Sequence, residues 1–217
     1  MIDSYIWGKV ERVSPEAPVP VVKVSHRENR LGGAANVALN VQSLGGKPYI
    51  CAIIGNDKDG AEFKSLLRNQ NLSEQGILEI RNRPTTVKTR IIAHNQQIVR
   101  VDAETDENIS EAETELMIGI IKKILAEQKI DAIIFEDYDK GLITEKLITE
   151  TVNFAESRGI ITVVDPKKRN FHSYKGVHLF KPNLKELEDG LKTVINPSKP
   201  DQVENAISKL KSQLGAK

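Results

Sequence analysis

The sequence predicts an α/β fold with a mainly parallel sheet covered by helices. Short, continuous apolar runs, such as residues 49–54 and 160–164, alternate with longer segments of helical periodicity. Apolar strands that alternate with helices are typical of a parallel sheet that is buried on both faces. Two β-branched stretches depart from this order, residues 14–24 and 84–102, and they predict an edge strand and a hairpin.

Length and charge limit the possible classes of function. The chain has 217 residues, enough for one large α/β domain with a sizeable core. Its 31 lysines and arginines nearly balance its 30 aspartates and glutamates, so no overall positive field would attract nucleic acid or an anionic membrane. No segment resembles a leader peptide or has the length of a membrane span. We therefore expect a cytoplasmic protein without a nucleic-acid or membrane partner.

The first elements are an edge strand and a helix that follows two glycines. Residues 14–24 carry three prolines among β-branched residues, a pattern that excludes a central strand and suits an edge strand in a lid or a partner interface. Residues 30–40 contain the glycines and then the Ala, Val and Leu spacing of a closely packed helix. Gly45 and Gly46 are expected to end that helix.

A strand–helix unit and a hairpin follow. Residues 49–54 predict an apolar strand, in which Cys51 is expected to behave as a buried hydrophobe and not as a nucleophile. A helix is predicted from about residue 57 to 69. The alternating, β-branched stretch 84–102 predicts a hairpin, because the polar residues from His94 interrupt it.

The second half of the chain continues the alternation. Ser110 and Glu113 form the sequence pattern of a capping box, which predicts a helix over residues 110–129. One face of that helix is expected to cover a sheet through Leu116, Ile120, Ile121 and Ile124. The later elements are predicted as strands over 132–135, 160–164 and 178–180, and helices over 144–158 and near Leu184 and Asp201.

The two glycines, Gly32 and Gly33, mark a possible ligand site. A helix N-terminus has unpaired amides with partial positive charge, and glycine allows a ligand to approach the backbone closely. Asn36 and Asn40 lie one turn apart on the same face and offer amide groups to hydroxyls. A closely packed turn without any ligand explains this stretch equally well.

Charged residues also follow three predicted strands. The segments 136–141, 165–169 and 181–186 contain carboxylates and lysines, and the carboxyl ends of parallel strands share one edge of a sheet. Lysines there suit phosphates, and carboxylates suit hydroxyls or Mg²⁺ held through water. Solvated loops of any α/β protein have similar composition. Likewise, Asn183 and Glu186 fit either a ligand site or a simple helix capping pair.

The hairpin adds further charges, and several familiar motifs are missing. Lys88 and Arg90 share one face of their strand and suit an anionic group, whereas Arg100 and Asp102 are most simply an ion pair. None of the four histidines has a partner at metal-ligand spacing. The phosphate-binding lysine loop, the dinucleotide glycine turn and the Gly-x-Ser-x-Gly elbow are absent from the sequence.

Taken together, these motifs resemble the ribokinase-like (PfkB) sugar kinases, and within them the kinase domain of the bacterial D-glycero-β-D-manno-heptose 7-phosphate kinases. The resemblance covers nearly the whole chain. It rests on residues 14–24, Gly32–Ala38, Asn95-Gln96-Gln97 with Arg100 and Asp102, Asp137-Tyr138 with Lys140-Gly141, Asp165-Pro166-Lys167, and Pro182-Asn183 with Glu186. The Gly-Gly-x-x-Asn and Asn-x-x-Glu motifs are general to the family. The Ser-Pro-Glu-Ala-Pro-Val-Pro and Asn-Gln-Gln motifs resemble the heptose branch.

The resemblance implies a role for each matching residue. The residues expected to hold sugar hydroxyls are Asp3, Gly32, Gly33 and Asn36. Those expected near the sugar phosphate are Lys88, Arg90 and Arg100, with Asp137 and Lys140 on the substrate rim. The nucleotide is expected to contact Lys167, Asn183 and Glu186, and Glu186 would also contact Mg²⁺ through water.

The implied reaction is transfer of the ATP γ-phosphoryl group to the anomeric hydroxyl of heptose 7-phosphate, which gives a 1,7-bisphosphate for lipopolysaccharide core precursors. The implied cofactors are ATP and Mg²⁺, and the implied substrate is a small sugar phosphate. Segments of about 9–30 and 84–103 would form a β lid. The resemblance implies a homodimer that is joined through this lid.

The chain departs from the family pattern at both ends. Of the family's first core strand, only Met1-Ile2-Asp3 matches. No Gly-Ala-Gly-Asp turn is present, so the family's aspartate base is expected beyond Lys217 and no catalytic residue is assigned. We therefore expect residues 1–217 to form a partial kinase domain, incomplete at both ends, with little or no activity. Two alternatives stay open: a ribokinase-like kinase of another sugar or nucleoside, and a non-catalytic module for sugar-phosphate binding or dimerisation.

Overall fold

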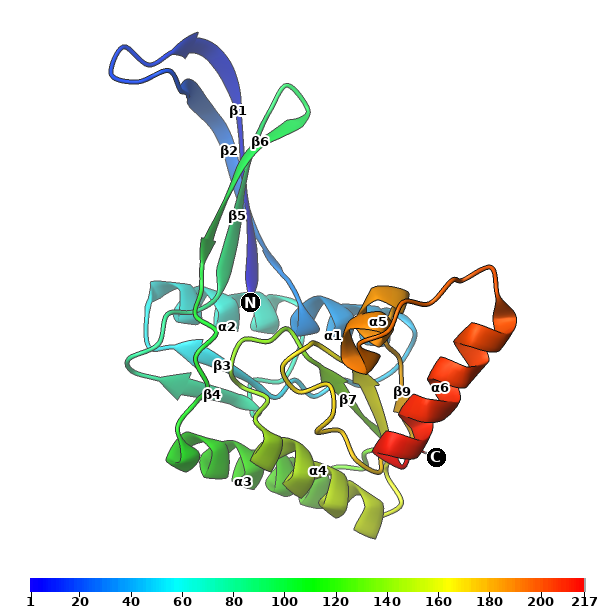
Figure 1. Cartoon of the computed structure of the whole chain (residues 1–217). Coiled ribbons are helices and arrows are strands. Elements are labelled where there is room, and N and C mark those ends of the chain that lie inside the picture. The colour runs from blue at the N-terminus through cyan, green and yellow to red at the C-terminus, as the bar shows by residue number, and fades with distance from the viewer. Residues whose placement is uncertain (217) are drawn as a thin grey trace. The chain divides into compact units, whose positions relative to one another are not determined.

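The computed structural model describes residues 1–216 and divides them into two compact units, with the boundary between Thr105 and Asp106. Unit 1 contains β1 (Ile2–Val13), β2 (Pro20–Leu31), α1 (Ala34–Ser43), β3 (Ala52–Gly55), α2 (Lys58–Asn69), β4 (Ile77–Ile80), β5 (Val87–Ala93) and β6 (Gln96–Ala103). Unit 2 contains α3 (Glu111–Glu127), β7 (Ala132–Glu136), α4 (Glu145–Ser157), β8 (Ile161–Asp165), β9 (Leu179–Phe180), α5 (Leu184–Leu191) and α6 (Pro200–Leu214). Figure 1 labels these elements.

One expectation concerns the end of the sequence. Lys217, beyond which the aspartate base is expected, lies outside the described residues. The expected position of that base therefore stays a prediction.

Four strands of unit 1 form a separate sheet, which we call the lid. The strand order is β2-β1-β5-β6, and β1 pairs antiparallel with β2 and parallel with β5. β5 and β6 form the predicted hairpin, and both residues of its turn, His94 and Asn95, have positive φ, as a tight two-residue turn requires. Figure 1 shows the lid as a long ribbon that projects away from α1 and α2.

The N-terminal part of the lid differs from the prediction in its boundaries. β2 is an edge strand, as expected, but it begins only at Pro20. Pro15 and Pro18 lie in the connection from β1, which is closed by a 2.9 Å hydrogen bond from Ser14 N to Val19 O. β1 begins at Ile2, earlier than the predicted lid boundary, because its alternating residues pair with β2 on one side and with β5 on the other.

Each antiparallel pairing of the lid has an irregular register. The β1–β2 register shifts between Trp7 and Gly8, and again between Val10 and Arg12. The β5–β6 register shifts between Ile91 and Ile92. Bulges of this kind bend a strand and increase its local twist.

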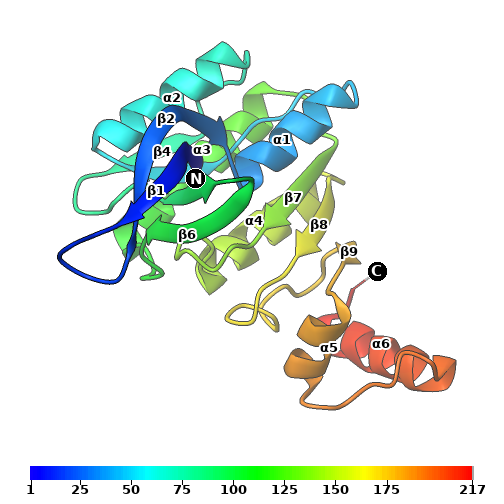
Figure 2. The same ribbon diagram turned by 90° about the horizontal axis from the view of Figure 1, so that it is seen from above.

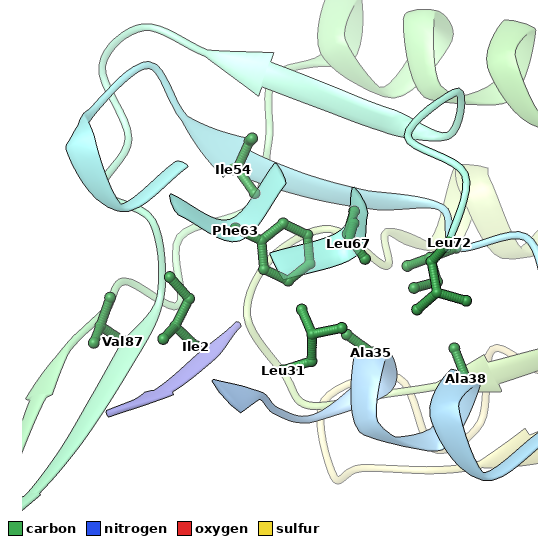
Figure 3. Packing of buried hydrophobic residues seen from close by; sticks show 10 residues of the cluster. Ile2, Leu31, Ala35, Ala38, Ile54, Phe63, Leu67, Leu72 and Val87 are labelled. Carbon is green, nitrogen blue, oxygen red and sulfur yellow. The ribbon is translucent and has the colours of Figure 1, made fainter. Parts of the chain in front are cut away.

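The lid strands start inside the core of unit 1. Ile2, Leu31 and Val87 stand at the lower ends of β1, β2 and β5, and they belong to the same buried cluster as Phe63 and Leu67 of α2 (Figure 3). α1 adds Ala35 and Ala38 to this cluster, and β3 adds Ile54. Because these side chains are removed from water together, the base of the lid is part of the hydrophobic core.

A polar network joins β3, α2 and the start of β5. Asp57 caps α2, and its carboxylate accepts hydrogen bonds from Gly60 N at 2.7 Å, Thr85 N at 2.8 Å and the Thr85 hydroxyl at 2.7 Å. The same hydroxyl accepts a 2.8 Å bond from Gly55 N. A Cβ at Gly60 would lie 2.2 Å from Gly55 O, so this close approach needs glycine.

Unit 2 is built on a parallel sheet of order β7-β8-β9. α3 and α4 pack against each other, and Leu125, Ala155 and Ile160 form one buried cluster. α5 and α6 lie side by side beyond β9, where Leu187, Leu210 and other apolar residues form a second cluster (Figure 2). Among the residues described, no helix combines the length and apolar character that a membrane span needs.

The predicted helix cap of α3 is confirmed, and its predicted buried face is confirmed at Ile124 but wrong at Leu116. Ser110 and Glu113 form a complete capping box, in which the side chain of each residue accepts a hydrogen bond from the backbone N–H of the other. Leu116 is 58% exposed, however, whereas the next residue, Met117, is fully buried together with Ile118. The mainly parallel α/β fold with a β lid is confirmed, and its parallel strands form two sheets, β3-β4 and β7-β8-β9. β4 was not predicted.

Candidate active site

Asp3, Gly32 and Arg90 meet at the base of the lid. Asp3 lies on β1 opposite Arg30 of β2 and Lys88 of β5. Arg90 Nη1 donates a 2.6 Å hydrogen bond to Asp3 Oδ1. Gly32 follows β2 directly, and a Cβ there would lie 2.4 Å from Asp3 Oδ2. Because Gly32 has no side chain, the Asp3 carboxylate can occupy this position.

The second glycine starts α1 in the expected way. Gly33 is the residue before the helix, and its φ of 56° lies in the left-handed region that favours glycine. No side chain caps this helix end. Asn36 and Asn40 are both exposed, whereas Ala35 and Ala38 face the core. The two asparagines thus present amide groups on the solvent side of the helix.

The three cations predicted near a sugar phosphate each have a carboxylate partner. Lys88 Nζ donates to Asp102 at 2.9 Å and to Glu104 at 2.7 Å. Burial lowers the pKa of Lys88, but these two carboxylates raise it more, so its pKa lies above the ordinary value. Arg100 Nε donates to Asp102 at 3.0 Å, which confirms the predicted ion pair. With Arg90 bound to Asp3, this part of the lid is charge-balanced.

Asp137 is buried within unit 2, with only 2% of its surface exposed. Its Oδ2 accepts hydrogen bonds from the Tyr174 hydroxyl at 2.8 Å and from Asn170 Nδ2 at 3.3 Å. Its Oδ1 accepts a 2.8 Å bond from Asp139 N. The carboxylate therefore joins the loop after β7, where Lys140 also lies, to the segment that follows β8.

Lys167, Asn183 and Glu186 come together at the carboxyl ends of β8 and β9. Lys167 Nζ donates to Glu186 Oε1 at 2.6 Å. Burial lowers the pKa of Lys167, but the hydrogen bond to Glu186 and the nearby negative charges raise it above the ordinary value. Asn183 and Glu186 form a complete capping box at the start of α5, so the capping interpretation of this pair is confirmed.

Several polar residues near these clusters were not predicted as site residues. Glu136 ends β7, and its pKa is raised by burial and by the neighbouring Asp165. Lys181 donates to Asp165 at 3.0 Å. In unit 1, the Asp57 and Thr85 network was also missed. The signal was available, because Asp57 is an aspartate directly before the predicted helix, where such residues commonly cap the helix N-terminus.

The candidate site residues thus form two clusters, one in each unit. Asp3, Gly32 and Arg90 with Lys88 form the cluster of unit 1, and Lys167, Asn183 and Glu186 form the cluster of unit 2. Cys51 belongs to neither, and burial raises the pKa of its thiol to about 11, which agrees with an inert thiol. Within residues 1–216, no group of three or more His, Cys, Asp or Glu side chains is arranged to hold a metal ion.

Comparisons with solved structures show which fold this arrangement follows. Phosphofructokinase-2 from Escherichia coli, solved with fructose-6-phosphate, matches all of this chain and 68% of its own, with a TM-score of 0.74 and 19% identity. Ribokinase from Arabidopsis thaliana, solved with ribose and ATP, matches 98% of this chain and 66% of its own, with a TM-score of 0.66 and 14% identity. At such low identities the likeness establishes the ribokinase-like fold alone.

Sequence relatives are closer. A bifunctional protein HldE from Helicobacter pylori is 42% identical over 190 residues, which cover 87% of this chain and 40% of the relative. A protein of the same name from Wolinella succinogenes is 41% identical over 196 residues, or 90% of this chain and 41% of the relative. The chain spans about two fifths of the length of these curated relatives. The sequence model of the pfkB family carbohydrate kinases matches residues 2–217, and the chain therefore belongs to that family.

Proposed function

We propose that this chain is the kinase part of an enzyme that transfers the ATP γ-phosphoryl group to the anomeric hydroxyl of D-glycero-D-manno-heptose 7-phosphate. The observation that carries the proposal is the cluster of Asp3, Gly32 and Arg90 at the base of a lid that also bears Lys88. Hydroxyl-binding groups and cations in one cluster suit a sugar phosphate. The heptose-type motifs at residues 14–20 and 95–97, with the identity to HldE proteins, support this substrate.

In the proposed site, Asp3 and the glycines hold the sugar. Asp3 accepts hydrogen bonds from sugar hydroxyls, and Arg90 orients its carboxylate through the 2.6 Å hydrogen bond. Gly32 leaves the space that the Asp3 carboxylate occupies, Gly33 keeps the turn before α1 free of a side chain, and the exposed Asn36 offers its amide. Positioning of this kind supplies much of the catalysis in phosphoryl transfer, because the reacting groups must be held in line.

The cations of the lid are proposed to bind the phosphate of the substrate. Arg90 and Arg100 have guanidinium groups that suit bidentate contact with phosphate oxygens. Lys88 is already bound to Asp102 and Glu104, so a phosphate that contacts Lys88 must share it with two carboxylates. This partial neutralisation reduces nonspecific binding of anions such as inorganic phosphate.

The unit 2 cluster is proposed to contact ATP. Lys167 and the amides at the start of α5 suit phosphate oxygens, and Asn183 and Glu186 fix the shape of that helix end. The described residues do not fit a metal held directly by protein ligands. They do fit Mg²⁺ that arrives with ATP and contacts Glu186 through water, and such an ion would neutralise phosphate charge.

Asp137 and Lys140 are proposed to act on the substrate rim in different ways. Both carboxylate oxygens of Asp137 already accept hydrogen bonds within unit 2, so its proposed role is to hold the loop that carries Lys140. From Met1 to Lys217 the sequence contains no Gly-Ala-Gly-Asp turn, so we assign no residue to accept the proton of the anomeric hydroxyl. On this basis, turnover by this chain alone should be absent or very weak.

The decisive test measures ADP release by the natural gene product with ATP, Mg²⁺ and a panel of sugars. We expect ADP release that depends on D-glycero-D-manno-heptose 7-phosphate and exceeds that with fructose 6-phosphate, ribose or adenosine. A faster reaction with another sugar or a nucleoside would show that the heptose is not the substrate, but it would still support the kinase activity. No sugar-dependent ADP release from any member of the panel would contradict the kinase proposal itself.

A further inference from the structure

Arg169 connects three segments of unit 2. The residue lies in the segment after β8, and its guanidinium group contacts residues 106–109, which we call the entry segment because the chain enters unit 2 there. Nη2 donates a 3.1 Å hydrogen bond to Asp106 Oδ2, and Nη1 donates to the Asp106 carbonyl oxygen and, at 3.1 Å, to Asn108 Oδ1. Nε lies 2.8 Å from Asp139 Oδ1 in the loop after β7. One side chain therefore connects the entry segment with both loops.

Asp139 depends on this contact more than the other partners do. Its φ of 54° lies in the left-handed region, which a residue with a side chain adopts only where its surroundings fix it. Its Oδ1 atom is buried and accepts no well-directed hydrogen bond within residues 1–216, so the positive charge of Arg169 at 2.8 Å offsets the cost of that burial. Arg169 therefore stabilises the conformation of the loop directly before Lys140.

The loop is held to the entry segment on the other side of Lys140 as well. The Gly141 carbonyl oxygen accepts a 2.9 Å hydrogen bond from Ile109 N, and Ile109 is buried. Lys140 thus lies between two anchored residues, Asp139 and Gly141. Because both anchors lead to residues 106–109, the position of Lys140 depends on the entry segment and not on β7 alone.

The entry segment is held within unit 2 although it borders unit 1 in the sequence. The carbonyl oxygen of Thr105, the last residue of unit 1, accepts a 3.4 Å hydrogen bond from Arg83 Nη2 of the same unit. Asp106, the first residue of unit 2, is bound by Arg169. Each side of the boundary is therefore bound by an arginine of its own unit, and contacts within unit 2 set the position of the entry segment.

Arg169 is not arranged to bind a phosphate itself. Its Nε, Nη1 and Nη2 atoms all face protein acceptors. Two carboxylates, those of Asp106 and Asp139, lie against its one positive charge, so the charge around it is net negative. Such a group would repel a phosphate. Its planar set of donors instead suits the fixing of several acceptors in one arrangement.

We propose that Arg169 is a positioning residue for the substrate rim: it holds Asp139 against the entry segment and so keeps Lys140 where it contacts the sugar phosphate. This inference rests on the proposed function and deepens it. Arg169 acts through the loop and touches no substrate. Its loss should therefore weaken the use of the sugar phosphate and leave the use of ATP unchanged.

Kinetics of the natural gene product test this role. Arg169→Met removes the charge and the planar donors, and we expect the KM for D-glycero-D-manno-heptose 7-phosphate to rise about three- to fivefold, as for the loss of a partly exposed ion pair. The KM for ATP should stay nearly unchanged. Arg169→Lys keeps the charge and should recover part of the loss. Arg158→Met is the matched control, because Arg158 also joins two segments, through a 2.9 Å bond to Leu125 O, but lies away from the rim; both constants should stay unchanged.

Amide hydrogen exchange of the same protein measures the position of the loop without catalysis. The amides of Asp139 and Ile109 donate the hydrogen bonds that hold the loop, so they should exchange faster in Arg169→Met and unchanged in Arg158→Met. Asp139→Asn removes the negative charge with a residue that tolerates a left-handed φ, and it should accelerate exchange at Ile109 to a similar degree. Adding Arg169→Met to Asp139→Asn should then have little further effect.

Failure of this inference can be told apart from failure of the proposed function. Unchanged exchange at Asp139 and Ile109 in Arg169→Met would overturn the positioning role, and so would faster exchange with an unchanged KM for the sugar phosphate. In either case, heptose-dependent ADP release by the wild type would still support the kinase. Faster exchange in the Arg169 and Asp139 variants, with no sugar-dependent ADP release by the wild type, would support Arg169 as the residue that positions the loop and would contradict the kinase.

Discussion

The Tyr174 hydroxyl donates a 2.8 Å hydrogen bond to Asp137 Oδ2, and both residues are almost completely buried within unit 2. The bond connects the loop after β7 with the segment after β8, from which Lys167 also comes. Asp137 has further donors in Asn170 and the backbone of Asp139. A buried carboxylate of this kind is stable only while its donors are in place.

We expect Tyr174→Phe to lower the free energy of unfolding by about 1–3 kcal/mol, because it leaves a buried carboxylate with one donor fewer. Urea denaturation of Tyr174→Phe, Asp137→Asn and the double variant measures the coupling. If the two residues act as one unit, the double variant loses clearly less stability than the sum of the single losses. Additive losses would show that the bond contributes little.

Gly32→Ala should weaken sugar binding selectively. The new Cβ would lie 2.4 Å from Asp3 Oδ2, so the carboxylate must move from its position. In the natural gene product we expect the KM for the sugar phosphate to rise about tenfold or more, which corresponds to about 1.4 kcal/mol, with little change in the KM for ATP. Equal changes in both KM values would argue against a role for Gly32 at the sugar.

Gly119→Ala is the matched control for that substitution. Gly119 lies in α3, and a Cβ there would meet no atom within 4 Å. Alanine favours a helix over glycine by up to about 1 kcal/mol, so this variant should unfold at a higher urea concentration. Its kinetic constants should stay unchanged.

Asp57 should make the stability of unit 1 sensitive to acid. Burial raises the pKa of Asp57, but the hydrogen bonds from Thr85 and Gly60 lower it more, so its pKa in the folded protein is below the ordinary value. A lowered pKa stabilises the fold above the pKa of the unfolded chain, about 3.9, and this contribution is lost as the pH falls through the folded pKa.

The measurement is urea denaturation of the wild type and Asp57→Asn between about pH 6 and pH 3. We expect the variant to be less stable at pH 6, and the difference between the two proteins to shrink towards pH 3. A difference that is independent of pH would mean that the charge of Asp57 is not what stabilises this network.

Lys167→Met should affect the nucleotide and not the sugar. The lysine is bound to Glu186 beside the start of α5, where ATP phosphates are proposed to bind. We expect a higher KM for ATP in the natural gene product, with the KM for the sugar phosphate nearly unchanged. Lys168→Met, at the exposed neighbouring position, is the control and should leave both constants unchanged. A rise in the KM for the sugar phosphate alone would contradict the assignment of Lys167 to the nucleotide.

The proposed dimer is tested on the outer face of the lid. Val99 and Val101 of β6 are 45% and 53% exposed, and exposed apolar residues on an edge strand suit a second copy of the lid. If the lid joins two subunits, Val99→Lys should shift the protein towards monomers in sedimentation velocity. Val194→Lys, in the loop after α5, should not. A wild-type protein that is monomeric at high concentration would contradict the dimer.

Local sequence signals predicted most of the helices and the hairpin. The Ser110 capping box and the polar turn after Ala93 each depend on neighbouring residues only, and each occurs in the structure. The short strand β4 was missed because its four residues, Ile77–Ile80, carry too little periodicity. The predicted buried face of α3 was wrong at Leu116 because Leu116 and Met117 are both apolar, and only tertiary packing decides which one is buried.

The candidate site was predictable to a lesser degree. The motifs named Asp3, Gly32 and Arg90, but the contact between Arg90 and Asp3 spans 87 residues and depends on the parallel pairing of β1 with β5. The burial of Asp137 could not be read from a loop that looks polar in sequence. The stacking of Tyr5 on Trp7 was not predicted, because it depends on β1 beginning at Ile2, earlier than the predicted lid boundary.

Two of the register shifts of the lid lie at one height in adjacent strands, and the shift between Val10 and Arg12 lies farther along β1. Trp7 and Gly8, where the β1–β2 pairing shifts, are level with Ile92 and Ala93, next to the shift between Ile91 and Ile92. Below this level the strands are anchored by core residues such as Ile2. The lid is therefore bent at this level. We expect the part of the lid beyond the bulges to be mobile and the part that is anchored in the core to be rigid. Amide hydrogen exchange should then be slow below Trp7 and fast above it.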